Sequence, residues 1–347
     1  MSHDPLSPPA DLLDTLSKWR RVVLVGHVTP DADCLGSMLA MARCWPSGDD
    51  QSAALSLPGT VSSRLRFMIQ LAGPRIAEPG DFAAADGYVV TDTAKCARSN
   101  ISGTVRADWP NGRPVINIDH HLSNTHFGDI NWVAPAASAS EMVYTVLVGL
   151  GRTIDPVAAS LLYAGMLTDT VGFSLPRTTA DTLRIASELV ARGADVGRLG
   201  ERLSRSLSRA EFDLLRIIYD NTTLIAGGRV AYSTASHEEI TGTGCGAEDI
   251  DDQVAVPRCL EGVAIAMLFT EGQPGRVRIN FRGESGVAVL RLARRFGGGG
   301  HAFASGAVMD GSIETVLEAV LPVAVKYAGE TVGMDAGPWA AVASAES

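Results

Sequence analysis

The sequence has no long hydrophobic run. Of its 347 residues, 46% are hydrophobic and 20% are charged. Even the apolar stretch 156–167 is closed by Thr168 and Asp169, and it is shorter than the roughly 18 apolar residues of a membrane span. The first 14 residues also lack the basic and apolar segments of a signal peptide. We therefore expect no membrane partner and a cytoplasmic location.

Paired cysteines are also missing. The five cysteines are Cys34, Cys44, Cys96, Cys245 and Cys259, with no C-x-x-C among them. One of them would stay unpaired in any full disulfide scheme, as expected of reduced thiols. We interpret the cysteines as structural or incidental.

Positive charge is scarce. Lys and Arg number 29 against 39 Asp and Glu, which gives a formal net charge of −10. The average field of such a protein repels a long nucleic-acid duplex. A nucleic-acid substrate should therefore be short, or should be bound through a local patch.

The chain has enough apolar material for a folded core, with a mean hydropathy of +0.13. Its length predicts about two domains. Short β-branched runs alternate with helical patterns in the first part, which predicts an α/β domain with a doubly wound, mainly parallel sheet at 1–195. The expected strands are 21–26, 87–91 and 114–118, and the expected helices are 35–45, 62–71, 140–150 and 178–193.

The character of the sequence changes after residue 195. Residues 196–221 are rich in Arg, Glu, Ser and Leu at helical spacing, which predicts a helical connector. Two stretches, 223–234 and 262–282, have the pattern of hairpins with Gly-rich turns. They predict a smaller mixed α/β domain at 222–330. The Ala/Ser/Gly-rich segment 331–347 is expected to be a frayed tail.

Carboxylates and imidazoles follow the expected strands at their carboxyl ends, where open α/β sheets bind ligands. One further carboxylate ends the apolar helical run 158–167. We expect the eight side chains to converge on one edge of the sheet. They are His27, Asp31, Asp33, Asp92, Asp119, His120, His121 and Asp169. For the first segment alone, the alternative is that Asp33 caps the following helix and Asp31 shapes a turn.

Five carboxylates in one crevice repel one another unless cations neutralise them. Mixed carboxylate and imidazole ligands suit Mn²⁺, with Mg²⁺, Co²⁺ or Fe²⁺ as alternatives. Zn²⁺ is less favoured because no thiolate is arranged to bind it, although Cys34 lies beside Asp33. The ligands exceed one coordination sphere and fit two divalent ions that share a carboxylate, as in phosphoryl-transfer enzymes. The sequence therefore predicts a dinuclear phosphoesterase.

A glycine run near the carboxyl end predicts anion binding. Gly297 to Gly300 are followed by His301, so backbone amides and an imidazole can approach a phosphate. By itself such a run could equally be a flexible surface turn. Its neighbours are basic, and Glu284 is the one acid among them, which favours phosphate binding over a solvated face. The basic residues are Arg276, Arg278, Arg282, Arg291, Arg294 and Arg295.

Together these motifs resemble the DHH phosphoesterase family with its DHH-associated C-terminal domain. The matching segments are HVTPDADCLGS (27–37), VVTDTA (89–94), NIDHH (117–121), TDTVGFS (168–174) and RFGGGGHAFASG (295–306). They span nearly the whole chain in the family's order. The two-domain layout is most similar to the nanoRNase/pAp phosphatase group and its stand-alone cyclic-di-AMP phosphodiesterase relatives.

The resemblance implies a role for each candidate residue. One ion would be held by His27, Asp31 and Asp92, and the other by Asp33, Asp92, His120 and Asp169. Asp92 would bridge the ions and act with His121, which would face the scissile phosphate. Asp119 would orient a ligand histidine. The substrate's terminal nucleotide would be bound by Gly298, Gly299, Gly300, His301 and Arg282. Ala32 and Cys34 depart from the family pattern without removing a ligand.

The activity implied by the resemblance is metal-dependent hydrolysis of short oligoribonucleotides to 5′-mononucleotides, and of pAp to AMP. Cleavage of cyclic di-AMP by the same centre is the nearest alternative. A nucleotide-binding regulator with an inert site is another, although the complete ligand set argues against inertness. The GGGH loop argues against a pyrophosphatase, and the absence of extra domains argues against a long-strand exonuclease. The expected partner is short RNA or a small nucleotide, with a homodimer as a further possibility.

Overall fold

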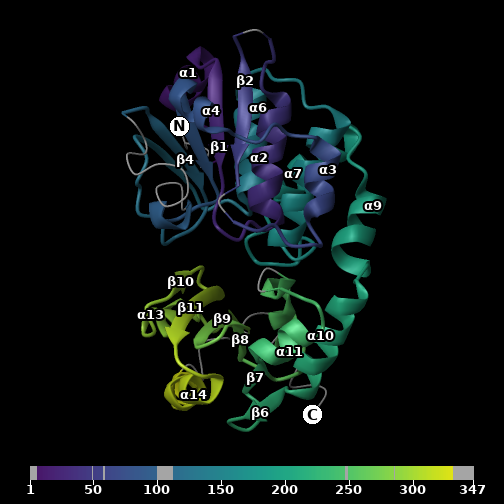
Figure 1. Cartoon of the computed structure of the whole chain (residues 1–347), viewed down its shortest axis with the longest axis vertical. Helices are drawn as coiled ribbons and strands as arrows, with labels where there is room; N and C mark the ends of the chain where they lie inside the picture. Colours follow the sequence, from purple (N-terminus) through teal and green to yellow (C-terminus); the bar gives the residue numbers. More distant parts are fainter. Residues whose placement is uncertain are drawn as a thin grey trace. The chain divides into compact units, whose positions relative to one another are not determined.

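The computed structural model of the protein describes residues 6–48, 50–57, 59–99, 112–246, 249–284 and 286–330. The chain divides into two compact units, Met1–Ser206 and Leu207–Ser347, whose helices and strands are labelled in Figure 1. The expected frayed tail, 331–347, lies outside the described residues. Each unit has its own sheet and its own hydrophobic core.

A parallel five-stranded sheet forms the centre of the first unit, in the order β2-β1-β3-β4-β5. Figure 1 labels β1, β2 and β4. Its strands are β1 Arg21–Val25, β2 Ser52–Ser56, β3 Gly87–Thr91, β4 Val115–Asp119 and β5 Ile130–Val133. The three expected strands are β1, β3 and β4, and the expected α/β class with a mainly parallel sheet is confirmed. The sequence analysis missed β2 and β5. The former consists mostly of small residues with low strand propensity, and the latter has only four residues.

The helices of the first unit begin mostly at polar caps. Asp31, Ser138 and Asp155 each accept a backbone N–H of the helix that follows, which satisfies amides that have no partner within the helix. The elements are α1 Ala10–Lys18, α2 Ala32–Cys44, α3 Arg66–Ala72, α4 Pro79–Ala84, the 3-10 helix η1 Cys96–Ser99, α6 Ala139–Gly149, α7 Pro156–Asp169, α8 Ala180–Ala191, α9 Val196–Gly200 and the π-helical turn η2 Glu201–Arg205.

Both faces of the parallel sheet are buried. Val22 and Leu24 of β1 belong to the large core with α2, α6 and α7, whereas Val23 and Val25 join a smaller core with Phe82 of α4. Successive residues of a strand point to opposite faces of the sheet. Helices on both sides are therefore needed, which is the doubly wound arrangement expected from the sequence.

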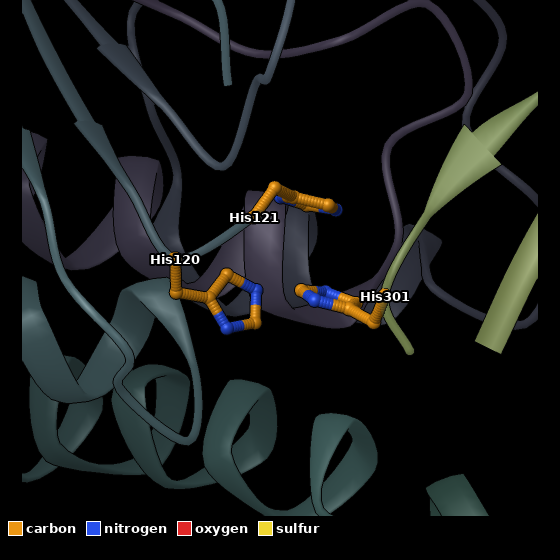
Figure 2. Close-up of side chains that lie close together, drawn as sticks. All are labelled: His120, His121 and His301. Carbon is orange, nitrogen blue, oxygen red and sulfur yellow. The ribbon is translucent and has the colours of Figure 1, made fainter. Parts of the chain in front are cut away.

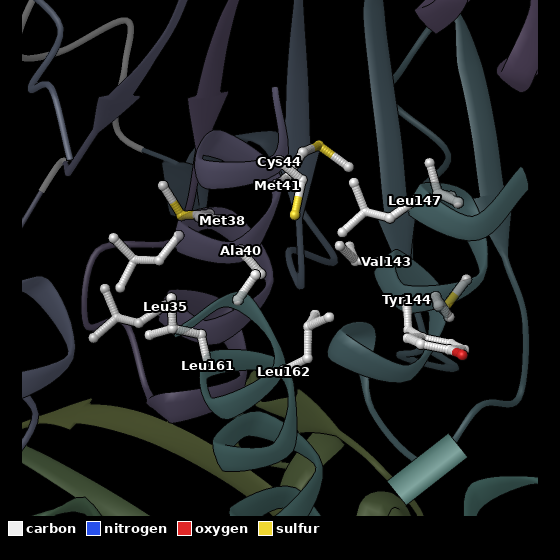
Figure 3. Packing of buried hydrophobic residues seen from close by; sticks show 14 of the residues in the cluster. Leu35, Met38, Ala40, Met41, Cys44, Val143, Tyr144, Leu147, Leu161 and Leu162 are labelled. Atoms are coloured by element: carbon white, nitrogen blue, oxygen red, sulfur yellow. The ribbon is translucent and has the colours of Figure 1, made fainter. Parts of the chain in front are cut away.

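Helices α2 and α7 pack against each other at close range. Leu35 of α2 and Leu161 of α7 lie in the same buried cluster (Figure 3). A Cβ added at Gly36 would lie 2.4 Å from the carbonyl oxygen of Leu161, and one added at Gly165 would lie 2.7 Å from Asp33 Oδ1. The two glycines thus let the helices come so close that the start of α2, which carries Asp33, packs against α7.

The second unit is built on a mixed six-stranded sheet in the order β10-β11-β9-β8-β7-β6. Strands β7 and β8 are parallel, and the other neighbouring pairs are antiparallel. The expected hairpins at 223–234 and 262–282 are the pairs β6/β7 and β8/β9, as predicted for a mixed domain. The strands are β6 Thr223–Ile225, β7 Val230–Ala235, β8 Ile265–Gln273, β9 Arg276–Gly283, β10 Gly299–Gly300 and β11 Ala304–Asp310.

Helices cover both faces of this second sheet. Phe281 of β9 packs in a core with Val320 of α14, whereas Leu268 of β8 packs on the opposite side with Leu214 of α10. The expected connector, 196–221, contains α9, η2 and α10. Among the described helices, none is both long and apolar enough to cross a membrane. The helices of this unit are α10 Arg209–Asp220, α11 His237–Gly242, η4 Asp251–Val254, α12 Ala255–Arg258, α13 Leu290–Arg294 and α14 Ile313–Glu330.

The contact between α2 and α7 predicts a stability difference between two glycine substitutions. Gly36→Ala should lower the free energy of unfolding by about 1–3 kcal/mol, because the new methyl group meets backbone that cannot rotate away. Gly80→Ala, in helix α4, is the matched control because no atom lies within 4 Å of its added Cβ. It should be neutral or slightly stabilising. Urea unfolding measures both, and equal stabilities would contradict the packing described.

Candidate metal centre and substrate loop

The turn between β1 and α2 supplies the first candidate ligands. His27 is buried, and its Nε2 lies 3.5 Å from Asp92 Oδ2. Asp31 is exposed, and its Oδ1 accepts the backbone N–H groups of Asp33 and Cys34 at 3.1 and 3.0 Å. Asp31 is therefore the cap of α2, so the alternative that gave this role to Asp33 is wrong.

Asp33 is anchored to the start of another helix. Its Oδ2 accepts the N–H of Ala139 at 2.6 Å, and its Oδ1 accepts the N–H of Ser140 at 2.8 Å. Both donors belong to the first turn of α6, where free amides and the helix dipole stabilise negative charge. The side chain of Asp33 also lies 3.9 Å from His120 Nε2. This buried carboxylate thus ties α2 to α6 at the edge of the cluster.

Asp92 follows β3 and lies in the middle of the cluster. Its backbone has a φ of +51° and its N–H donates to Ile118 O at 3.0 Å. A left-handed conformation is uncommon outside glycine, although Asp adopts it more readily than most residues. Such a conformation is typical of functional positions, where the surrounding structure enforces it. Only 2% of the residue is exposed.

The two histidines after β4 have different partners. His120 Nδ1 lies 3.2 Å from the carbonyl oxygen of Ala136, so Nε2 is turned toward the carboxylates. It lies 3.4 Å from Asp92 Oδ1 and 3.4 Å from Asp169 Oδ2. The ring of His121 stands at 72° to the ring of His120, with centroids 4.9 Å apart (Figure 2). A backbone bond at one ring nitrogen is the usual way a ligand histidine is oriented.

Asp119 binds His121, and its expected role in orienting a ligand histidine stays a prediction. His121 Nδ1 donates to Asp119 Oδ1 at 2.7 Å, and Asn124 Nδ2 donates to Asp119 Oδ2 at 2.5 Å. Asn124 also donates to Asn117 Oδ1 at 2.8 Å. His121 is thus held by a buried polar network beneath β4.

Arg177 is a neighbour of the cluster that the sequence analysis missed. Its Nη2 donates to the backbone oxygen of Asp169 at 2.6 Å and lies 3.0 Å from Asp169 Oδ2. The loop between them contains Val171, Gly172 and Phe173, all with positive φ. No periodic pattern marks such a loop in the sequence, so only the structure could reveal this ion pair.

In the first unit, three sets of side chains have donor atoms close enough together to hold a metal ion. Each set has donor atoms within 4.8 Å of one another, and all three include Asp92. Asp92 Oδ1 is buried and makes no well-aligned hydrogen bond among the described residues, although ring nitrogens of His120 and His121 lie 3.4 and 3.5 Å away. A buried oxygen so poorly satisfied by protein donors fits a cation site, since an unsatisfied buried polar atom is costly. The sets are His27, Cys34 and Asp92; Asp33, Asp92 and His120; and Asp92, Asp119 and His121.

The electrostatics of the cluster also call for positive charge. Burial, and then the charges of Asp92 and Asp169, raise the pKa of Asp33 well above its usual value. Burial lowers the pKa of His120, but Asp169 and Asp92 outweigh it and raise that pKa to about 10. Without an ion, His120 is therefore protonated at neutral pH. A divalent cation would replace this proton, because a ligand histidine is neutral.

The glycine-rich loop of the second unit is tightly built. Gly298 N–H donates to Ala293 O at 3.0 Å, and His301 N–H donates to Ala304 O at 2.7 Å. A Cβ at Gly298 would lie 2.2 Å from Gly306 O, and one at Gly300 would lie 2.6 Å from Ala304 O. The run is thus not a loose turn, and its glycines allow close backbone approach. The amide of Gly298, which we expected to face an anion, bonds within the unit instead.

Arginine residues share one face of β9, beside this loop. Arg276, Arg278 and Arg282 alternate with buried apolar residues, and Arg282 pairs in register with Ala304 of β11. Glu284, the one acid of the segment, forms an ion pair with Arg258 from outside it. This ion pair joins the segment to a residue outside it. His301, which Figure 2 also labels, belongs to this unit.

The central position of Asp92 predicts the effect of neutralising it. Asp92→Asn should leave fewer than two divalent ions bound per chain with the helix content retained, because its carboxylate is shared by the three donor sets of the first unit. Elemental analysis after gel filtration in Mn²⁺, with circular dichroism on the same samples, measures both quantities. Asp11→Asn, which removes an exposed carboxylate on α1, should keep the wild-type count. Two tightly bound ions in the Asp92 variant would contradict the shared role.

Comparisons with known proteins identify two domain families along the chain and relatives that span most of it. The DHH family N-terminal domain matches residues 21–166, and the DHHA1 domain matches residues 228–330. A Thermus thermophilus protein named bifunctional oligoribonuclease and PAP phosphatase NrnA is 30% identical over 309 residues, covering 86% of this chain and 89% of its own. The Bacillus subtilis protein of the same name is 29% identical over 303 residues, covering 86% and 92%.

A solved structure supports the fold independently. An exopolyphosphatase-related protein from Bacteroides fragilis superposes with a TM-score of 0.80 at 24% sequence identity, covering 92% of this chain and 96% of its own. At that identity the likeness concerns the fold, including its two-domain composition. With both domain models matched along the sequence and the family's acidic and histidine residues gathered around Asp92, this chain belongs to the DHH family of phosphoesterases.

Proposed function

We propose that this protein is a dinuclear metal-dependent hydrolase that degrades very short oligoribonucleotides to 5′-mononucleotides and converts pAp to AMP. The observation that carries the proposal is the position of Asp92, whose buried carboxylate belongs to all three donor sets of the first unit. A shared carboxylate is the hallmark of two-ion phosphoryl-transfer centres. The names of the relatives from Thermus thermophilus and Bacillus subtilis support this substrate class.

The residues proposed to hold the ions are those expected from the sequence. His27, Asp31 and Asp92 would bind one ion, and the other would be bound by Asp33, Asp92, His120 and Asp169. Oxygen and imidazole donors favour Mn²⁺, with Mg²⁺ or Co²⁺ as substitutes. When bound, the two ions supply the positive charge that stabilises in-line displacement at phosphorus.

His121 is the side chain that we assign to the scissile phosphate. Asp119 holds its Nδ1 at 2.7 Å, which fixes the ring's orientation and leaves Nε2 as the atom to meet a phosphoryl oxygen. A preorganised donor of this kind stabilises charge that develops in the transition state. Asp119 therefore acts through His121, and its own carboxylate stays bound to the polar network that includes Asn124.

The loop of the second unit is proposed to select short substrates. His301, Arg282 and the glycines Gly298, Gly299 and Gly300 offer a few closely spaced groups, which suit one terminal nucleotide better than a long strand. Arginine on the same face of β9 adds positive charge to a chain that is acidic overall. A long duplex is therefore not a substrate.

A cytoplasmic location is part of this proposal. All five cysteines are free thiols in the structure. A homodimer is retained as a proposal that gel filtration with light scattering would test.

A substrate panel tests the proposed function directly. With Mn²⁺, the protein should turn over di- to pentaribonucleotides and pAp about tenfold faster than cyclic di-AMP, or more. A tenfold ratio corresponds to a difference of about 1.4 kcal/mol in transition-state stabilisation. A long duplex should not be cleaved, exhaustive chelation should abolish turnover, and Zn²⁺ should serve poorly. A preference for cyclic di-AMP would show that the proposed substrate assignment is wrong. Full activity in protein shown to be metal-free would refute the dinuclear mechanism.

His301 provides a test of the division between chemistry and recognition. His301→Ala should lower kcat/KM on dinucleotides and pAp by about 100-fold, as when a charge-stabilising donor is lost. The small activated ester bis-p-nitrophenyl phosphate serves as the internal control, and its hydrolysis should fall much less, with the metal content unchanged. An equal loss on both substrates, or a missing ion, would place His301 in the catalytic centre instead.

A further inference from the structure

Cys34 is one of the two positions at which the first motif departs from the family pattern, and its side chain lies at the metal centre. It is the third residue of α2 and is fully buried. Its Sγ, a ring nitrogen of His27 and a carboxylate oxygen of Asp92 all lie within 4.8 Å of one another. The His27 Nε2 and Asp92 Oδ2 atoms are 3.5 Å apart. A buried sulfur therefore accompanies two residues assigned to the first ion.

The backbone directs the sulfur toward this position. The N–H of His27 donates to Cys34 Sγ, and a Cβ added at Gly26 would lie 2.5 Å from the same sulfur. Only a glycine at the end of β1 leaves room for it. On its other side, the thiol makes a weak S–H contact of 3.9 Å with Met38 Sδ. A thioether is a weak acceptor, so this contact adds little to the position of the sulfur. Burial, and then the charge of Asp92, raise the pKa of the Cys34 thiol well above its usual value.

One carboxylate oxygen of Asp31 is engaged in a helix cap. Its Oδ1 accepts the amides of Asp33 and Cys34 at the start of α2, although burial and then the charge of Asp92 raise the pKa of Asp31 to about 6, so its carboxylate still faces the cluster. Among the described residues, no candidate donor set contains Asp31, whereas one contains Cys34. Donor atoms that share one tetrahedral ion are about 3.3–3.8 Å apart, given bond lengths of about 2.0–2.3 Å. The three donor atoms lie within 4.8 Å of one another, and an ion that binds all three would draw them into that range.

We propose that Cys34 supplies a sulfur donor to the first metal position, so that His27, Cys34 and Asp92 form a mixed nitrogen, sulfur and oxygen site for thiophilic divalent ions such as Zn²⁺, Cd²⁺ and Co²⁺. Thiolate selects these ions over Mn²⁺ and Mg²⁺, which prefer oxygen. Coordination forms one sulfur–metal bond, breaks the S–H bond and releases the proton to water, with no change of oxidation state. The centre would thus bind softer ions more tightly than carboxylates and imidazoles alone would allow.

Cobalt substitution provides a test that needs no turnover. The full-length protein, freed of metal by chelation, is titrated with Co²⁺ while the near-ultraviolet absorbance is recorded. Wild type should develop a thiolate-to-Co²⁺ charge-transfer band. Cys34→Ser should lose the band and Cys44→Ser should keep it, because Cys44 is a buried thiol at the far end of the same helix. A missing band in wild type, or a band that survives in Cys34→Ser, would overturn the proposal.

Metal affinities separate a ligand from a packing residue. Competition titrations should show Zn²⁺ and Cd²⁺ binding weakened by at least about tenfold in Cys34→Ser, since even the loss of an outer-sphere partner costs that much. Mn²⁺ binding should change by less than about twofold, because a hard ion gains little from sulfur. Equal losses for Mn²⁺ and Zn²⁺ would overturn the proposal by showing a structural role. Cys34→Ala gives the same comparison if the serine variant does not fold.

The inference rests on the proposed metal centre but fails separately from the proposed activity. A protein that shows the charge-transfer band and hydrolyses none of the tested substrates would keep the sulfur ligand and lose the activity. A protein that hydrolyses short RNA with Mn²⁺ and shows no band would keep the activity and lose only the sulfur ligand.

Discussion

Asp92 has a buried carboxylate surrounded by imidazole nitrogens. Ring nitrogens of His27, His120 and His121 lie 3.4–3.5 Å from its two oxygens, and other buried carboxylates lie nearby. Burying like charges together is costly unless a cation compensates them. The first unit can keep this arrangement because divalent ions can replace the protons that otherwise balance the charge. The rest of the site is organised by the same requirement.

The scaffold brings these groups together through backbone contacts. The carboxylate of Asp33 is bonded by two amides at the start of α6, and the glycines of α2 and α7 let the two helices approach closely. His120 is oriented by the carbonyl of Ala136. Asp33 and His120 are thus held by backbone atoms that do not depend on a metal, so these two candidate ligands are positioned before any ion binds.

The two units differ in the chemistry they carry. Acids and histidines dominate the cluster of the first unit, whereas arginines line β9 of the second. A substrate with phosphate groups needs metal cations for the reaction and hydrogen-bond donors for recognition. In this proposal the first unit binds the cations and the second unit supplies the donors. Cys34 adds a further difference, since one buried sulfur can change which ions the first unit prefers while every oxygen and nitrogen donor stays in place.

The sequence by itself determined the fold class and the three central strands, and it supplied the candidate residues of the cluster. It did so because short β-branched runs bounded by turn residues are typical of buried parallel strands, and because residues after parallel strands share one edge of the sheet. The sequence could not determine the hydrogen-bond partners of these residues. Four hydrogen bonds depend on the side-chain directions and loop conformations of the folded chain. In these bonds Asp31 caps α2, Asp119 binds His121, Arg177 binds the backbone of Asp169, and Gly298 bonds within its own unit. Only the tertiary structure decides these partners, because the spacing of residues along the sequence does not tell which atoms lie within hydrogen-bonding distance of one another.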